Sequence, residues 1–185
     1  NGYLIDQFLR DGTNLRDDAY GGPVENRIRL LGEVTAALIG VWGADRVGVR
    51  LSPNGDSQGV DDSAPERLFP AAAAALDALG IAFLELREPG PDGTFGRTDV
   101  PRQSPAIRKV FAGPLILNSD YDVDQAKAAL ESGVADAISF GRPFIANPDL
   151  VERIRTGAAW APDNMQTWYS PGPEGYIDYP ALVAA

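Results

Sequence analysis

The hydrophobic residues of the chain follow two kinds of pattern, which alternate from one end to the other. Short apolar runs bounded by Gly, Pro or Asn predict buried parallel strands, whereas apolar residues that recur every three to four positions predict helices. We expect strands at 46–51, 81–87, 114–118 and 135–140. We expect helices at 3–8, 23–42, 65–79, 104–111, 122–132 and 147–156, followed by a tail without clear periodicity.

This alternation of strand and helix predicts an α/β fold with a parallel sheet and right-handed crossovers. A doubly wound sheet would usually carry a glycine-rich first strand-to-helix turn, which the sequence lacks. A (β/α)8 TIM barrel instead places functional side chains at the carboxyl ends of its strands, where the sequence has Arg50, Arg87, Asn118 and Arg142. A full barrel needs about 250 residues. We therefore expect residues 1–185 to be the C-terminal half of a single TIM-barrel domain, supplying strands 5–8, with the N-terminal half missing.

The charge of the chain and two absent residue types narrow the chemistry that it can perform. With 16 basic and 26 acidic residues, the net charge of −10 argues against nucleic acid as a partner. The sequence has no Cys, which excludes disulfides and thiolate metal sites, and no His, the commonest general base and metal ligand. No apolar stretch is long enough to predict a membrane span. The absence of Cys fits a cytoplasmic protein, and no metal site is expected.

One candidate site follows the last predicted strand. The apolar run 135–140 ends in Gly141 and Arg142, followed by Pro143. Glycine lets a ligand approach the backbone closely, and the arginine fork matches phosphate oxygens, so this strand end is a candidate phosphate site. A simple turn with a surface arginine is the alternative. The same expected strand pair, 114–118 and 135–140, fits the phosphate site that barrels form after strands 7 and 8.

A series of short motifs occurs in order along the chain: 1–9 (NGYLIDQFL), 18–22 (DAYGG), 25–27 (ENR), 47–53 (VGVRLSP), 140–143 (FGRP), 147–150 (NPDL) and 175–180 (GYIDYP). Together they resemble the Old Yellow Enzyme family of FMN-dependent ene-reductases, over nearly the whole chain. The closing motif resembles the branch of the family that reduces enones, maleimides and nitrate esters. The chain begins at Asn1 without a methionine, inside the first motif, which suggests a piece of a longer protein.

The resemblance implies an oxidoreductase with a TIM barrel that holds FMN at the carboxyl end of its strands. In the family, NAD(P)H reduces FMN, and hydride then passes to the β-carbon of an activated alkene such as an enone, maleimide or nitroalkene. Asn1 resembles the second member of the pair that hydrogen-bonds the activating oxygen of the substrate, and Tyr3 resembles the proton donor. Donors aimed at that oxygen stabilise developing negative charge, and a phenol is protonated at neutral pH.

The same resemblance assigns residues to the cofactor and to the substrate pocket. Arg50 resembles the arginine that faces the pyrimidine edge of the flavin, where the reduced cofactor carries negative charge. Gly141 and Arg142 match the FMN phosphate site, and the backbone near Asn118 and Ser119 resembles its other half. The acidic Asp120 is unexpected there, and we expect its side chain to point away and cap the next helix. A further pair of aromatic residues resembles the wall of the pocket over the flavin: Trp168 and Tyr169.

Two other functions remain open from the residues alone. A phosphate-binding lyase or isomerase without flavin needs a base at a strand end, but Lys109 and Lys127 lie in predicted helices and Glu85 lies in mid-strand. The second alternative function is that of a non-catalytic half-barrel subunit. A half barrel leaves unpaired sheet edges and an open apolar interior. We therefore expect the N-terminal half of the barrel as a partner, either as a second chain of a split or permuted protein or as a cleaved segment. We expect activity only when that half is present.

Overall fold

The computed structural model describes residues 1–55, 59–89 and 100–182. The chain divides into two compact units, Asn1–Ser139 and Phe140–Ala185, and each is described by itself. The first unit contains the sheet, and the second contains short helices and the tail. Within the described ranges, no helix has the length and apolar character that crossing a bilayer requires.

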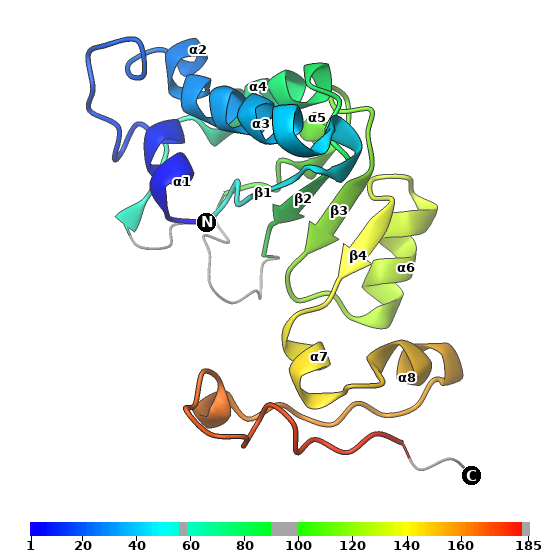
Figure 1. Cartoon of the computed structure of the whole chain (residues 1–185). Coiled ribbons are helices and arrows are strands. Elements are labelled where there is room, and N and C mark those ends of the chain that lie inside the picture. The colour runs from blue at the N-terminus through cyan, green and yellow to red at the C-terminus, as the bar shows by residue number, and fades with distance from the viewer. Residues whose placement is uncertain (56–58, 90–99, 183–185) are drawn as a thin grey trace. The chain divides into compact units, whose positions relative to one another are not determined.

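The first unit contains a parallel sheet whose strands are neighbours in the order in which they occur along the chain (Figure 1). Its strands are β1 (Gly48–Leu51), β2 (Phe83–Arg87), β3 (Leu115–Asn118) and β4 (Ala137–Ser139). Each strand pairs in parallel with the next one. This confirms the predicted α/β parallel sheet, and the sequential order without reversal is typical of a segment of a barrel rather than of a doubly wound sheet.

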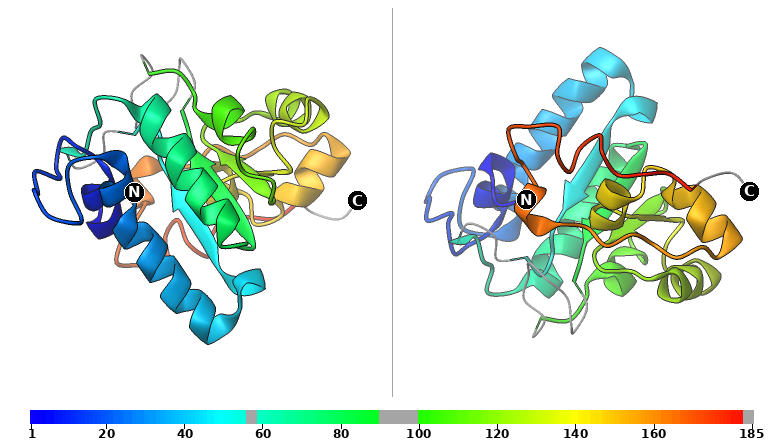
Figure 2. Two further views of the ribbon diagram at one scale, coloured as in Figure 1. Left: turned by 90° about the horizontal axis from the view of Figure 1, so that it is seen from above. Right: turned by 90° about the horizontal axis from the view of Figure 1, so that it is seen from below.

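Helices cover one face of this sheet. Those of the first unit are α1 (Leu4–Leu9), α2 (Val24–Arg27), α3 (Arg29–Trp42), α4 (Pro65–Ala78), α5 (Ser104–Ile107) and α6 (Val123–Glu131), with a short 3-10 turn η1 (Ala44–Arg46). Seen from above, α3 and α4 lie next to each other over the strands (Figure 2). The second unit contains α7 (Arg142–Ala146), α8 (Leu150–Thr156) and the 3-10 turn η3 (Met165–Thr167).

The core lies between the sheet and the helices. Alternate residues of the two central strands are buried together with one face of α4: Leu84, Leu86, Leu115, Leu117, Leu68, Phe69, Ala72 and Leu76. The intervening strand residues, among them Glu85 and Asn118, are only half-buried. Because side chains alternate across a strand, the sheet has one covered apolar face and one open face that carries polar groups.

Three local differences from the sequence-based expectations have clear physical reasons. The helix expected at 23–42 is interrupted at Ile28, so that α2 and α3 are separate. Strand β4 is half-exposed rather than buried, because it pairs only with β3 among the described residues. A helix, α7, begins at Arg142, before the helix expected at 147–156 and in place of the simple turn that is the alternative for Gly141 and Arg142. Pro143 suits the start of a helix because it has a suitable φ and lacks only an N–H that would be unpaired there.

Helix α6 begins with a complete capping box. The side chain of Asp122 accepts a hydrogen bond from the backbone N–H of Gln125 at 2.7 Å, and the Gln125 side chain accepts one from the N–H of Asp122 at 3.3 Å. The N-cap is therefore Asp122, and the expectation that Asp120 caps this helix is wrong.

Candidate active site

Both predicted catalytic residues line one hollow in the first unit, together with Arg50. This hollow, of about 490 Å³, lies between α1, α3 and β1. Its polar members include Asn1, Tyr3, Arg50 and Ser52. Its walls are mainly apolar: Leu4, Ile5, Leu9, Leu31, Val34, Leu38, Val49 and Leu51. Tyr3 is 68% exposed, so its side chain is accessible. An apolar hollow with a few polar groups is the usual form of a small-molecule site.

The segment that carries Asn1 and Tyr3 is held by a buried carboxylate in α1. Gly2 has φ +73°, a left-handed conformation that favours glycine. Its N–H donates to Asp6 Oδ2 at 2.8 Å, and Asp6 Oδ1 accepts a hydrogen bond from Arg10 Nε at 2.8 Å. Asp6 thus fixes the residue between Asn1 and Tyr3 while it forms an ion pair with Arg10, one helical turn further on.

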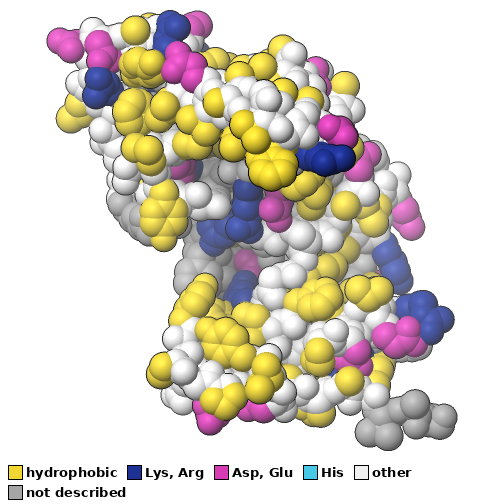
Figure 3. Space-filling view, viewed as in Figure 1, with side chains coloured by type: hydrophobic (Ala, Val, Ile, Leu, Met, Phe, Trp, Pro, Cys, Tyr) yellow, Lys and Arg dark blue, Asp and Glu magenta, His cyan; other side chains and the backbone are white. Residues whose placement is uncertain are grey.

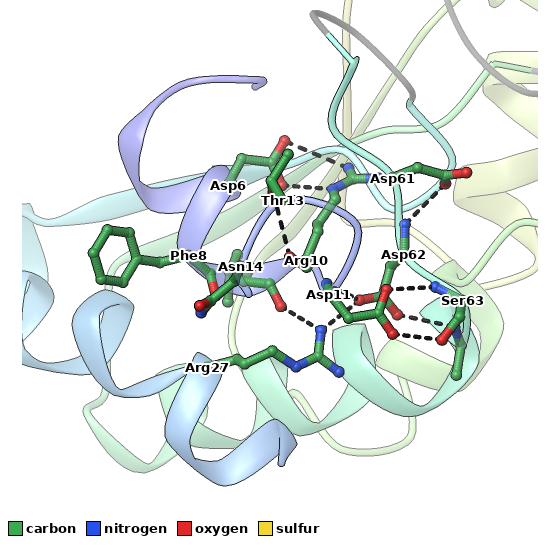
Figure 4. Close-up of polar contacts among 12 residues, drawn as sticks. Asp6, Phe8, Arg10, Asp11, Thr13, Asn14, Arg27, Asp61, Asp62 and Ser63 are labelled. Carbon is green, nitrogen blue, oxygen red and sulfur yellow. Dashed lines mark hydrogen bonds and ion pairs between the residues drawn. The ribbon is translucent and has the colours of Figure 1, made fainter. Parts of the chain in front are cut away.

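Arg10 extends this connection to the loop that follows β1. It is 1% exposed and donates hydrogen bonds to the carbonyl oxygens of Ser52 and Gly55. Its guanidinium also lies 5.1 Å from the ring centroid of Phe69, a cation–π arrangement. Figure 4 shows the pair of Asp6 and Arg10. Through its hydrogen bond to Ser52, this pair connects the segment before α1 with the end of the strand that carries Arg50.

A second buried arginine anchors the neighbouring loops. Arg27 donates to the carbonyl oxygen of Leu9 at 2.6 Å and forms an ion pair with Asp62, whose carboxylate also accepts from the Asp11 N–H at 3.0 Å (Figure 4). The sequence motif that contains Arg27 thus has an anchoring role. Asp6, Arg10 and Asp62 were not predicted, although the i, i+4 spacing of Asp6 and Arg10 within an apolar helix is a signal that could have identified that pair.

The open face of the sheet carries a hydrogen-bonded network with one side chain from each strand. Arg50 Nε lies 3.3 Å from Glu85 Oε2, and another Arg50 nitrogen donates to Asn118 Oδ1 at 2.8 Å. Ser139 Oγ donates to Glu85 Oε1 at 2.6 Å, and Asn118 Nδ2 donates to Ser139 Oγ at 2.9 Å. Basic side chains and an acidic one are visible below α3 in Figure 3. The structure thus brings Arg50 and Asn118, both predicted cofactor residues, into direct contact.

The backbone after β3 has an unusual conformation at the predicted phosphate site. Ser119 has φ +107° and Asp120 has φ +54°, so two successive non-glycine residues lie in the left-handed region. Such conformations are strained for residues with a Cβ and tend to occur at ligand-binding turns. In the second unit, Gly141 is the N-cap of α7 and Arg142 its first residue. Gly141 is exposed, and a Cβ added there would meet nothing within 4 Å.

The predicted aromatic pair belongs to the second unit, after η3. Tyr169 is 92% exposed and has φ +58°. Trp168 Nε1 is buried, without a hydrogen-bond partner among the described residues. These two aromatic residues belong to the second unit, as do Gly141 and Arg142. Their part in one site with residues of the first unit stays a prediction.

The described residues offer few candidates for a general base. Lys109 and Lys127 are exposed at or near helices, and Glu85 belongs to the network with Arg50. Glu88, which directly follows β2, is a buried carboxylate that was not predicted; burial raises its pKa, while it accepts hydrogen bonds from the N–H groups of Gln103 and Ser104. Glu88 therefore holds the start of α5. In the part of the chain that the structure describes, no group of three Asp or Glu residues is placed to hold a metal.

Comparison with known proteins identifies clear relatives. The sequence profile of the NADH:flavin oxidoreductase / NADH oxidase family matches residues 1–160. The chain is 43% identical to putative 12-oxophytodienoate reductase 10 of Oryza sativa subsp. japonica over 98% of this chain and 59% of that protein. It is 40% identical to a probable flavin mononucleotide-dependent alkene reductase of Leishmania infantum, over 98% of this chain and 48% of the relative.

A solved structure from the same family has a closely similar fold. The old yellow enzyme homologue of Zymomonas mobilis matches with a TM-score of 0.96 and 60% sequence identity, covering 98% of this chain and 51% of that one. The chain therefore spans about half the length of the relatives that it matches. The likeness supports the interpretation of the sheet as part of a TIM barrel.

Proposed function

Because the chain belongs to the Old Yellow Enzyme family of flavin oxidoreductases, we propose that it is the C-terminal half of an FMN-dependent ene-reductase. The observation that carries this proposal is the hollow that Asn1, Tyr3 and Arg50 share. It combines an amide donor, a phenol and a fixed positive charge with apolar walls. A small electron-poor alkene matches the chemistry of these polar groups. The apolar wall beside α3 is left for the other half of the barrel.

The chain's own residues take distinct roles in this proposal. Asn1 donates a hydrogen bond to the carbonyl or nitro oxygen that activates the alkene, and so stabilises negative charge on that oxygen. Tyr3 delivers a proton to the α-carbon from its hydroxyl group. Arg50 presents its guanidinium to the electron-rich edge of the cofactor. FMN, reduced by NAD(P)H, supplies the hydride for the β-carbon when it is bound.

The cofactor's phosphate fits the groups at two strand ends. The left-handed backbone at Ser119 supports a turn whose N–H groups face an anion, next to Asn118. The backbone of the exposed Gly141 and the guanidinium of Arg142 provide the other donors. Trp168 and Tyr169 form a wall of the substrate pocket in this proposal.

The other half of the barrel completes the enzyme. Strand β1 pairs with β2 on one side only, among the described residues, and its other edge adjoins the apolar hollow. An unpaired edge beside apolar side chains is suited to a further strand and helix. We therefore propose that residues 1–185 are part of one barrel domain and that activity requires the N-terminal half, on the same chain or on another.

The visible absorption spectrum tests the proposed function. The full protein that contains this chain, purified and mixed with FMN, is expected to show a flavin spectrum that bleaches with NADPH under anaerobic conditions. Addition of an enone should restore the oxidised spectrum. A protein that takes up no FMN would contradict the proposal, and so would a bound flavin that an enone, a maleimide and a nitroalkene all fail to reoxidise.

The replacement Arg142→Ala tests the phosphate site. Loss of a charge-assisted contact to phosphate is expected to weaken FMN binding about 10- to 100-fold, measured by titration of flavin absorbance. The matched control is Arg155→Ala, because Arg155 is 71% exposed and forms an ion pair with Glu152, at 2.5 Å, on the surface of α8. Equal FMN affinities for the two variants would remove Arg142 from the proposed site.

A further inference from the structure

A feature that the proposed roles leave unexplained is the carboxylate of Glu85 beside Arg50. Glu85 lies in the middle of β2, directly opposite Arg50 in the register of β1 and β2. Its Oε2 is 3.3 Å from Arg50 Nε, and its Oε1 accepts a hydrogen bond from Ser139 at 2.6 Å. Both carboxylate oxygens therefore have a partner, one from β1 and one from β4.

The network is set by the sheet rather than by freely moving surface side chains. Asn118 and Ser139 are also opposite each other in register, and their side chains are 2.9 Å apart. Asn118 Oδ1 accepts a hydrogen bond from Arg50, so the guanidinium is held from two directions. The Glu85 side chain is 20% exposed and that of Arg50 is 42% exposed. The carboxylate thus lies deeper than the guanidinium, which keeps an accessible side.

The charges of the network nearly cancel. Arg50 contributes one positive charge and Glu85 one negative charge, whereas Asn118 and Ser139 are neutral. A ligand that meets the accessible side of Arg50 therefore experiences a positive charge that the carboxylate behind it weakens. If Glu85 is replaced by neutral Gln, whose side-chain oxygen can still accept a hydrogen bond from Arg50, the guanidinium stays oriented but its full charge acts on the ligand.

We propose that Glu85 is a positioning residue that orients Arg50 and limits the positive charge that Arg50 presents to the flavin. This inference rests on the proposed function, since it assumes that Arg50 faces the cofactor. Positive charge favours the reduced, more negative form of FMN over the oxidised form. Glu85 therefore keeps the reduction potential of the bound FMN lower than Arg50 alone would set it.

The test is the reduction potential of FMN bound to the full protein with Glu85→Gln, measured spectroscopically against a reference dye. One charge acting over about 10 Å at an effective dielectric constant near 20 changes such an equilibrium by about tenfold. We therefore expect a positive shift of the potential that corresponds to about a tenfold gain in the preference for reduced over oxidised FMN. A loss of packing alone would not produce this shift in this direction.

Three further variants complete the design. Glu85→Asp keeps the negative charge, so its bound FMN is expected to have a reduction potential near that of the wild type. Glu131→Gln makes the same charge change on the exposed face of α6 and is expected to leave the potential unaltered. Glu85→Ala provides the measurement if Glu85→Gln does not fold.

The outcomes separate this inference from the proposed function. A wild-type protein that binds no FMN would contradict the proposed function and the inference with it. A wild type that binds FMN, together with a potential in Glu85→Gln that is unchanged or more negative, would overturn the inference alone. A positive shift of the potential in Glu85→Gln, together with a potential near that of the wild type in Glu85→Asp, supports both the proposed function and the inference.

Discussion

Replacement of Tyr3 by Phe is expected to slow alkene reduction at least about 100-fold, the usual loss when a general acid is removed. Reduction of the bound FMN by NADPH is expected to continue at the wild-type rate. The change removes one hydroxyl group from a side chain that is 68% exposed, so we expect little change in the stability of the fold. Stopped-flow absorbance measures the two half-reactions separately: bleaching by NADPH first, and reoxidation by an enone second.

The control for this experiment is Tyr176→Phe. Tyr176 is 58% exposed and belongs to the tail of the second unit, where we assign it no part in the chemistry. Its loss of a hydroxyl group should leave both half-reactions unaltered. Enone turnover at the wild-type rate in Tyr3→Phe would show that another group donates the proton.

Replacement of Arg10 by Met is expected to lower the free energy of unfolding by about 3–5 kcal/mol, the cost of leaving the partner of a buried ion pair uncompensated. Asp6 would keep a buried charge, and the carbonyl oxygens of Ser52 and Gly55 would each lose the hydrogen bond from Arg10. Urea denaturation of the full protein, followed by far-UV circular dichroism, measures the loss.

Two comparisons make the result specific. Arg46→Met removes an arginine whose side chain is 71% exposed and lies 4.0 Å from its acidic neighbour, so the expected cost is below about 1 kcal/mol. The double variant Asp6→Asn with Arg10→Met removes the isolated charge and should recover part of the lost stability. If Arg10→Met costs no more than Arg46→Met, the pair is not the buried anchor that its contacts indicate.

The elements of the first unit were predictable because local patterns determine them. Strands β2 and β3 are short apolar runs in the core, and α4 has the periodicity of a helix with one buried face. The carboxyl ends of parallel strands meet at one edge of a sheet, which is why Arg50 and Asn118 could be expected near each other. Asn1 and Tyr3 precede α1 and follow no described strand, so only the family resemblance predicted that they lie near Arg50.

Other features depend on relations that no single stretch of sequence contains. The network of Glu85 with Arg50 and Ser139 follows from the register of separate strands, so the sequence alone showed Glu85 only as a mid-strand residue. The exposure of β4 depends on which strand lies at the edge. Helix α7 could not be assigned from sequence because Gly141, Arg142 and Pro143 suit a simple turn as well as the start of a helix, and only the following backbone decides between the two.

The Asp6–Arg10 pair has a consequence for attempts to change the substrate range by mutagenesis. Helix α1 is only six residues long. It contributes exposed positions of the hollow, such as Leu4, as well as the buried Asp6, whose partner Arg10 directly follows the helix. A library that randomises the whole helix would therefore lose most of its members to misfolding before selectivity is selected, because natural proteins have little surplus stability. Mutational tolerance within α1 is thus uneven, and Leu4 and Ile5 can be varied productively only while Asp6 and Arg10 are kept.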